Sequence, residues 1–185
     1  TCRSLWGRGT PNYAGEQEDL MPQSIEKARE ALKASGYSGQ KVVIINPTDF
    51  PDIGPLGQVT ADVLAKIGMN VDLNESDWGT VIQRRNSREP VDKGGWSIFH
   101  TTGSTFGWSN PALSTLVRGQ GQAGWFGWWT NPQAEALAEE WLFATDEAAQ
   151  KKAAGDLGRL ALDQVATVPL GQFTIKTAYR KSLTG

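Results

Sequence analysis

The chain has 185 residues with 18 basic and 20 acidic side chains, and its formal net charge is -2 at pH 7. Because the charges are balanced and not grouped into blocks, a nucleic-acid footprint or a polybasic membrane surface is not expected. No apolar run is long enough to span a bilayer, and the lone Cys2 excludes an intrachain disulfide and a thiolate metal cage. Thr1 follows no initiator methionine or signal-peptide pattern, so we expect a processed or truncated part of a larger protein.

The first 23 residues are rich in glycine, proline and polar residues, and we expect them to form an irregular lead-in. Ser24 is a typical N-cap residue, and apolar residues at helical spacing follow it. Gly36 can adopt the left-handed conformation that often ends a helix. These two positions therefore predict the boundaries of a first helix.

Residues 42–73 predict a βαβ unit. The apolar run 42–45 is typical of a buried strand. Apolar residues at helical spacing follow over 56–67, and Gly68 can end that helix. Apolar and polar residues then alternate over 71–73, which indicates a second strand. Two strands joined through a helix form a parallel pair with a right-handed crossover.

A further helix and strand complete this region. Asp77 is a typical N-cap for a helix over 78–88, in which Val81 and Ile82 would face inward. Three arginines would then be exposed: Arg84, Arg85 and Arg88. They are more typical of a solvated helix face than of an anion site. Residues 96–101 suit a third strand, so the predicted fold class is α/β, with a mostly parallel sheet flanked by helices.

An aromatic, glycine-rich segment extends from Gly94 to Asn131. It holds five of the eight tryptophans and eight glycines, and its one permanently charged side chain is Arg118. Large flat side chains on an adaptable backbone are typical of a surface that binds a small organic ligand. A long loop that buries its own aromatic side chains would have the same composition. The composition alone leaves both interpretations open.

Helical patterns dominate the C-terminal part. Asn110-Pro111 and Asn131-Pro132 each place a capping asparagine before a proline that suits the first helical position. We expect a short helix after the first pair and a longer one after the second. The apolar stripe of the longer helix comprises Ala134, Leu137, Ala138, Trp141 and Leu142. Asp146 predicts a last helix that runs to about Gln164. Two later segments look extended: 165–169 and 173–178.

Catalytic groups are scarce. His100 is the one histidine, so a histidine zinc site or a Ser-His-Asp triad would depend on it. No H-E-x-x-H, G-x-S-x-G or phosphate-loop motif accompanies it. His100 falls within the third predicted strand, where a packed or hydrogen-bonded histidine is the more typical role. We expect no catalytic residue, no metal site and no cofactor.

Two further motifs indicate structural roles. Residues 119–124 read G-x-G-x-x-G, but they follow a helix-like stretch and continue into Trp125. A dinucleotide motif follows a strand and begins a helix, so we expect no dinucleotide site. The carboxylate pairs Glu139-Glu140 and Asp146-Glu147 lie at polar helical positions or helix starts, where solvated and capping roles are typical. Nothing in their spacing favours paired glycosidase acids.

Five segments carry a resemblance to a known family. They are Ser24–Tyr37, Val59–Val71 with its Leu64-Ala-Lys-Ile-Gly68 turn, Gly127-Trp-Trp-Thr-Asn-Pro132 through Leu137, Val168-Pro-Leu170, and Tyr179–Gly185. In this order and spacing they resemble the large extracytoplasmic solute-binding proteins of ABC importers, the dipeptide- and oligopeptide-binding family (family 5). The resemblance covers roughly residues 20–185.

This resemblance implies a periplasmic-binding-protein-like lobe. Residues 24–167 would form the C-terminal lobe of a longer, two-lobed protein, preceded by the lead-in 1–23. Residues 168–185 would cross back toward the other lobe. The function implied is periplasmic capture of a small solute (a peptide, a sugar or another organic molecule) for transport. The two lobes would close on the solute and dock on permease subunits in the membrane.

The aromatic segment departs from the family pattern. Peptide-binding members typically carry a Gly-Trp pair after the third strand, and an Asp that takes the amino terminus of the ligand. Thr102 and Gly103 stand at that pair here, and Phe106 stands near the Asp. A ring face offers an ammonium group only a weak cation–π contact in place of an ion pair. A free peptide amino terminus is therefore not the expected anchor, and sugars, other apolar-faced solutes and peptides held differently stay open.

Seven residues are our candidates for the ligand-binding surface: Thr102, Ser104, Phe106, Trp108, Trp125, Phe126 and Trp128. The aromatic rings would stack on the ligand and the hydroxyls would orient it. Trp96 and Trp141 are expected in the core. One alternative is a carbohydrate-active hydrolase or carbohydrate-binding domain with an aromatic platform. Another is a lobe whose aromatic side chains only pack internally.

Overall fold

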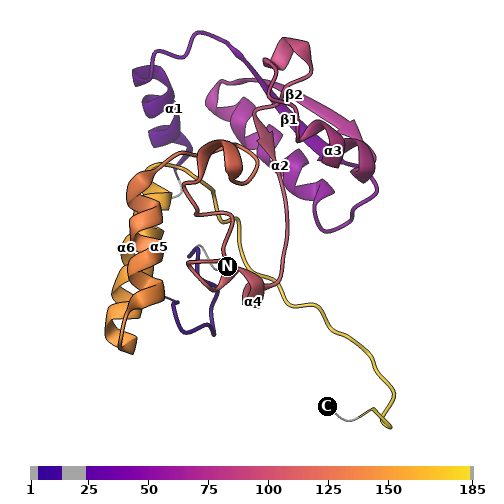
Figure 1. Cartoon of the computed structure of the whole chain (residues 1–185). Helices are drawn as coiled ribbons and strands as arrows, with labels where there is room; N and C mark the ends of the chain where they lie inside the picture. Colours follow the sequence, from indigo (N-terminus) through magenta and orange to yellow (C-terminus); the bar gives the residue numbers. More distant parts are fainter. Residues whose placement is uncertain (1–3, 14–23, 184–185) are drawn as a thin grey trace. The chain divides into compact units, whose positions relative to one another are not determined.

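The structure is a computed structural model in which residues 4–13 and 24–183 are described (Figure 1). The chain divides into two compact units. The sheet unit is Pro22–Ser104, and the helical unit combines Thr1–Met21 with Thr105–Gly185. Cys2 and the residues of the predicted lead-in at 14–23 lie outside the described residues.

The sheet unit begins with a helix and continues as a βαβ unit. These elements are α1 (Ile25–Ala34), β1 (Lys41–Pro47), α2 (Gly54–Ile67) and β2 (Asn70–Ser76). They are followed by α3 (Trp78–Arg84), the 3-10 helix η2 (Val91–Lys93) and β3 (Ile98–Phe99). The strand order is β2-β1-β3, and both pairs are parallel. The predicted α/β fold, with a parallel sheet flanked by helices, is confirmed (Figure 1).

β1 is the central strand, and its position explains its sequence. Val43, Ile44 and Ile45 are at most 2% exposed. A strand that is covered on both faces buries successive side chains, so its sequence is continuously apolar instead of alternating. Val43 and Ile45 pack with Val81 of α3 in one core cluster. This cluster fixes α3 against the sheet.

Local signals set most helix boundaries in the sheet unit. The side chains of Ser24 and Asp77 each accept a hydrogen bond from the backbone N–H three residues further on, at the first turns of α1 and α3. Gly68 follows α2 with a φ of +107°, a conformation that side chains with a Cβ rarely adopt. The two predicted caps and the predicted end of α2 are confirmed.

Two elements are shorter than predicted. α3 ends at Arg84, because the Asn86 side chain donates to carbonyls of the last turn and closes it. β3 contains only Ile98–Phe99 of the predicted 96–101. Trp96 lies outside the strand, since its indole N–H donates to the carbonyl of the residue that caps α3. The ring still packs against the core, as predicted for this tryptophan.

The predicted exposed arginine face of α3 is wrong for Arg84 and Arg85. Arg84 donates to the Asn74 side chain and to two backbone carbonyls just after η2. The Arg85 guanidinium lies 5.6 Å from the centroid of the Phe99 ring. Both side chains are half-buried, whereas Arg88 is exposed as predicted. Arg84 and Arg85 therefore join α3 to its neighbours instead of forming a solvated face.

The helical unit contains four helices in its described part: α4 (Thr105–Trp108), the 3-10 helix η3 (Gly121–Ala123), α5 (Pro132–Phe143) and α6 (Glu147–Asp163). Asn131 and Asp146 cap α5 and α6 as predicted. The short helix predicted after Asn110-Pro111 is absent. Residues 111–117 form turns instead, because the Asn110 side chain and carbonyl hold only the first turn in place.

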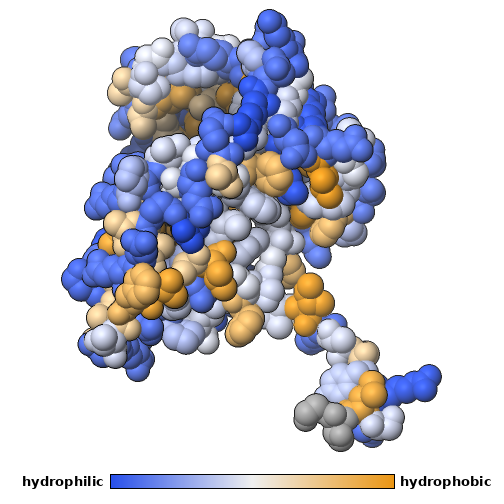
Figure 2. All heavy atoms as spheres, in the orientation of Figure 1, coloured by the Kyte–Doolittle hydropathy of each residue, from blue (hydrophilic) through white to orange (hydrophobic). Residues whose placement is uncertain are grey.

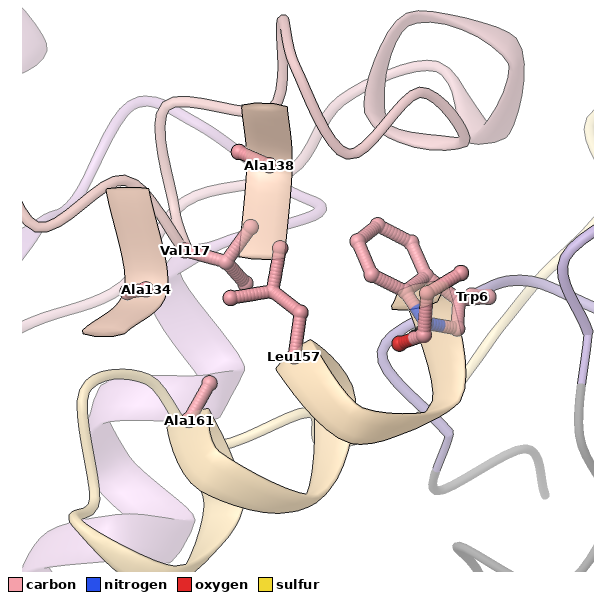
Figure 3. Close-up of a cluster of buried hydrophobic side chains, with 7 residues drawn as sticks. Trp6, Val117, Ala134, Ala138, Leu157 and Ala161 are labelled. Atoms are coloured by element: carbon pink, nitrogen blue, oxygen red, sulfur yellow. Dashed lines mark hydrogen bonds between the residues drawn. The ribbon is translucent and has the colours of Figure 1, made fainter. Parts of the chain in front are cut away.

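A core of alanines and larger apolar side chains holds α5 and α6 together (Figure 3). Its buried members are Trp6, Val117, Ala134, Ala138, Ala154, Leu157 and Ala161. Small side chains on facing helices permit close packing, and the larger ones fill the remaining volume. Trp6 comes from the predicted lead-in, and its indole N–H donates to the Ala154 carbonyl at 2.9 Å. The described part of the lead-in therefore contributes to the core of the helical unit.

The chain after α6 forms no helix or strand within residues 164–183. Figure 2 shows hydrophobic residues along this C-terminal segment. The large apolar or aromatic side chains exposed in this segment include Val165, Val168, Leu170, Phe173, Ile175 and Tyr179, each at least 49% exposed. The predicted stripe on α5 is also wrong at Leu142, which is 54% exposed one residue before the helix ends. Across the described residues, no helix combines the length and the apolar character needed to cross a membrane.

Candidate functional site

The seven candidate residues divide between the two units. Thr102 and Ser104 belong to the sheet unit, and the five aromatic candidates belong to the helical unit. The structure brings Trp125, Phe126 and Trp128 together on one loop. Phe106 and Trp108 lie on the single turn of α4. Each group is described in its own unit.

Thr102 follows β3 at the carboxyl end of the parallel sheet. Ligands of open α/β sheets usually bind beyond this end of the strands. Thr102 is half-buried and Ser104 is exposed. Polar side chains also gather at this edge, where Asn46 and Gln58 both donate to Glu75 Oε1, at 3.3 and 3.2 Å. The edge therefore offers hydroxyl, amide and carboxylate groups.

His100 lies just before this edge and is 7% exposed. Its Nε2 is 2.8 Å from the Thr60 hydroxyl oxygen on α2. Its Nδ1 is buried and makes no hydrogen bond with any described group. Burial lowers the pKa of His100, because the imidazolium form would lose its hydration. The predicted packed and hydrogen-bonded histidine is confirmed.

The helical unit presents a closed loop, residues 120–130, which we call the aromatic loop. Its ends are joined by an antiparallel bridge between Gln120 and Thr130. The backbone N–H of Gly121 donates to the Trp129 carbonyl at 2.8 Å. Within the loop, η3 is followed by a turn in which Trp128 N–H donates to the Trp125 carbonyl. The two ends of the aromatic loop are therefore held together by backbone hydrogen bonds.

An ion pair holds the base of the aromatic loop. Arg118 Nε donates to Glu135 Oε1 at 2.8 Å, and a second guanidinium nitrogen donates to Oε2 at 2.5 Å. Glu135 Oε1 also accepts from the backbone N–H of Gly119 at 2.7 Å. Arg118 further donates to the Ala112 carbonyl. Hydrogen bonding to Arg118 is the main cause that lowers the pKa of Glu135, so the carboxylate is charged at neutral pH.

The aromatic side chains of this loop are half-buried. The Trp125 and Phe126 rings lie edge to face, with centroids 4.9 Å apart. Trp129 packs against the core of the helical unit, so it serves as an anchor. Trp128 has a φ of +52°, and Gly127 before it has a φ of +99°. A tryptophan in the left-handed region is an uncommon feature that often accompanies function.

The two aromatic candidates on α4 differ in their exposure to solvent. Phe106 is 88% exposed, whereas Trp108 is half-buried. A fully exposed phenylalanine gains little from burial within its own unit. Phe106 therefore suits contact with another molecule better than internal packing.

The G-x-G-x-x-G segment 119–124 is not a dinucleotide motif, as predicted. It contains η3 and the loop bridge, and it neither follows a strand nor begins an α-helix. Its glycines permit loop closure instead, since a Cβ added at Gly119 would lie 2.2 Å from the Asn131 carbonyl oxygen. Among the described residues, no group of three His, Cys, Asp or Glu side chains could hold a metal ion.

Sequence reasoning missed Glu135 as part of the site. One signal could have found it: a single arginine in a long uncharged segment needs a carboxylate when it is partly buried. Glu135 is the first acidic residue after Arg118. A structural contact was missed as well: the Asn12 side-chain oxygen accepts a hydrogen bond from the indole N–H of Trp141 at 3.2 Å. That contact links residues far apart in the sequence, and no local sequence pattern predicts it.

Comparison with known proteins gives relatives for most of the chain. No model of a protein family matches it. Over 160 residues, the chain is 40% identical to a probable peptide ABC transporter periplasmic-binding protein of Sinorhizobium fredii. The aligned region covers 86% of this chain and 30% of that protein. The chain therefore spans about a third of the length of this relative. The predicted resemblance to solute-binding proteins of ABC importers is confirmed.

Solved structures agree with this fold. A putative peptide-binding protein from Clostridium difficile superposes with a TM-score of 0.72 at 17% identity, over 89% of this chain and 33% of that one. A mannohexaose-bound oligopeptide-binding protein of an ABC transporter from Thermotoga maritima gives a TM-score of 0.66 at 20% identity, over 86% of this chain and 33% of that one. The chain has the fold of one part of these larger binding proteins.

Proposed function

We propose that this chain is the ligand-binding lobe of a periplasmic substrate-binding protein of a peptide-type ABC importer, which captures a solute for transport. The observation that carries the proposal is the 40% identity over 160 residues to a protein named as a periplasmic-binding protein of this type. Identity at this level over most of a chain accompanies a shared fold and, commonly, a shared mode of action. The solute would be a peptide, a sugar or another small organic molecule, and the further partners would be permease subunits.

We further propose that the protein binds its solute without catalysis. Two of the similar proteins are named as binding proteins of ABC transporters, and a third is named as a putative peptide-binding protein. The carbohydrate-active hydrolase that the aromatic residues also allowed finds no support among them. The candidate residues supply stacking surfaces and hydroxyls. Such groups bind and orient a ligand, whereas hydrolysis of a glycosidic bond usually needs a pair of placed carboxylic acids.

Two groups of residues are the proposed ligand contacts, one in each unit. In the sheet unit they are Thr102 and Ser104, which follow β3 at the carboxyl edge. In the helical unit they are Phe106, Trp108, Trp125, Phe126 and Trp128. Support for the first group comes from their place beyond the parallel strands. Support for the second comes from the exposed ring of Phe106 and from the anchored aromatic loop.

Residues 168–185 are proposed to cross toward the remainder of a longer protein. The lobe that they leave comprises residues 24–167 and the buried Trp6 of the lead-in. Val168, Phe173 and Ile175 are each more than half exposed, and the described part of the segment joins no strand. Apolar residues in an extended chain need a partner to cover them. Hydrogen exchange should show protected amides over 173–178 in the full natural protein and rapid exchange in the isolated chain. Equally rapid exchange in both would refute this assignment.

A thermal-shift screen of the full natural protein tests the proposed function. The panel would contain peptides, neutral sugars, opines and metal chelates. A solute that binds only the folded protein raises the melting temperature, by an amount that grows with its concentration above Kd. We expect one class of solute to raise it and the other classes to leave it unchanged. A protein that no solute of the panel stabilises would not be a receptor of the proposed kind.

A further inference from the structure

One long segment of the helical unit, residues 105–134, is almost free of formal charge. From Thr105 to Ala134, Arg118 is the one side chain that carries a full charge. Its guanidinium makes two hydrogen bonds to the Glu135 carboxylate and a third to the Ala112 carbonyl. The side chains of Arg118 and Glu135 are 23% and 30% exposed. This charge is therefore used to hold the base of the aromatic loop, and its partner neutralises it.

A charged ligand group placed against this loop would find no counter-charge on it. The amino and carboxyl termini of a free peptide lose hydration when they leave water, and only an opposite charge or several strong hydrogen bonds offset that loss. A ligand with C–H faces and hydroxyl groups does not have this problem. Its faces can stack on aromatic rings, and its hydroxyls can exchange hydrogen bonds with amides and the backbone. Gln122, which is exposed on the same loop, is such an amide.

The backbone of the loop shows that the position of one ring is enforced. Trp128 has a left-handed φ of +52° directly after Gly127 at +99°. Glycine is the residue that accepts this conformation without strain, yet the second of the two positions holds a tryptophan. Strain of this kind persists where the surrounding structure imposes it, commonly at ligand sites. The antiparallel bridge and the ion pair at the loop base supply that constraint here.

We propose that the aromatic loop binds an uncharged saccharide, whose sugar faces stack on Trp125 and Trp128. The inference rests on the proposed function and specifies its ligand class. Three observations carry it: the absence of an uncompensated charge over 105–134, the half-buried edge-to-face pair Trp125–Phe126, and the enforced left-handed Trp128. The protein would then recognise its solute mainly through ring stacking rather than through ion pairs to peptide termini.

Titration calorimetry of the full natural protein tests this inference. The probes are three neutral hexasaccharides (mannohexaose, cellohexaose and maltohexaose) and, for comparison, unblocked di- and pentapeptides. We expect at least one hexasaccharide to bind, with a Kd that changes less than about two-fold between about 0.05 and about 0.5 M NaCl, because screening acts on charged groups. Trp125→Ala and Trp128→Ala should each weaken binding by roughly ten-fold or more, since each removes a stacking face. Phe143→Ala, which removes a 74% exposed ring at the end of α5, is the matched control and should leave Kd unchanged.

The outcomes separate this inference from the proposed function. Peptide binding without saccharide binding would overturn the saccharide assignment and leave the proposed function intact. Saccharide binding that both tryptophan variants retain, while they unfold at the wild-type temperature, would overturn the role of the aromatic loop. Failure of every hexasaccharide and every peptide would overturn the saccharide assignment, and the wider thermal-shift panel would then decide the proposed function. If Trp125→Ala fails to fold, Trp125→Phe, which keeps a smaller ring, replaces it and is expected to bind the saccharide with intermediate affinity.

Discussion

Arg118 and Glu135 form a two-point ion pair at the base of the aromatic loop, with nitrogen–oxygen distances of 2.8 and 2.5 Å. The same carboxylate accepts a hydrogen bond from the backbone N–H of Gly119. The Glu135 side chain therefore neutralises Arg118 and also holds the backbone just before the aromatic loop. Because Glu135 lies in the first turn of α5, the helix N-terminus also favours its negative charge. The aromatic loop is thereby tied to the helix that contributes to the core.

Loss of this pair should destabilise the helical unit. Glu135→Gln removes the counter-charge of a partly buried guanidinium, and we expect it to lower the free energy of unfolding by about 1–2 kcal/mol. Urea denaturation measures the change. The matched control is Asp62→Asn, which breaks an exposed pair with Lys66 and should cost less than about 0.5 kcal/mol. Equal effects of the two substitutions would mean that the Arg118 pair has no structural role.

The backbone at position 128 predicts an uncommon stability order. In Trp128→Gly the left-handed conformation is free of strain, whereas Trp128→Ala retains it. Both variants lose the same indole, so the glycine variant should be more stable than the alanine variant by about 1 kcal/mol. Thermal denaturation followed by circular dichroism gives this difference. An alanine variant at least as stable as the glycine variant would show that the residue does not hold the left-handed conformation.

The sequence predicted the elements whose signals are local. Ser24, Asp77, Asn131 and Asp146 each bond to a backbone N–H three residues on, so the cap and its partner lie in one short stretch of sequence. The parallel pairing of β1 and β2 followed from the helix between them. The G-x-G-x-x-G segment was rejected from its neighbours alone. In each case the determining contacts span a few residues or one connection.

Contacts between distant residues could not be predicted. Arg84 was expected in solvent, but its partner Asn74 lies on a different element. Trp6 was expected in an irregular lead-in, whereas its indole N–H donates to a carbonyl 148 residues further along the chain. The composition of the aromatic segment left two interpretations open, a ligand surface and a loop that buries its own aromatic side chains. It could not indicate that Gln120 pairs with Thr130, because a loop bridge leaves no periodic pattern in the sequence.

Trp6 should be a principal stabilising residue of the helical unit. Its side chain is fully buried among Val117, Leu157 and the alanines of α5 and α6. Trp6→Ala is expected to lower the free energy of unfolding by about 3–5 kcal/mol, since it leaves a cavity that the helices cannot close. Trp6→Phe keeps most of the ring but loses the hydrogen bond to Ala154, so its cost should be smaller. If Trp6→Ala and the wild type had the same free energy of unfolding, residues 4–13 would not belong to this core.

His100 should make the stability of the sheet unit depend on pH. Burial lowers its pKa in the folded protein below the ordinary value of 6.5 that the unfolded chain keeps. Between these two pKa values the unfolded chain binds more protons, so the contribution of His100 is fully present above pH 6.5 and decreases as the pH falls through the window. Chemical denaturation from about pH 7.5 to about pH 5 should show this decrease in the wild type. His100→Gln, which cannot titrate, should show a smaller decrease, and identical pH profiles would exclude His100 as the cause.

We propose that this chain belongs to a receptor that holds a solute and releases it unchanged. Equilibrium dialysis of the full natural protein against the solute that raises its melting temperature, with mass spectrometry of both chambers, tests it most directly. We expect one bound solute per protein molecule and an unaltered solute mass after prolonged incubation. Accumulation of a cleaved or otherwise modified product, or a solute concentration equal in both chambers, would contradict it.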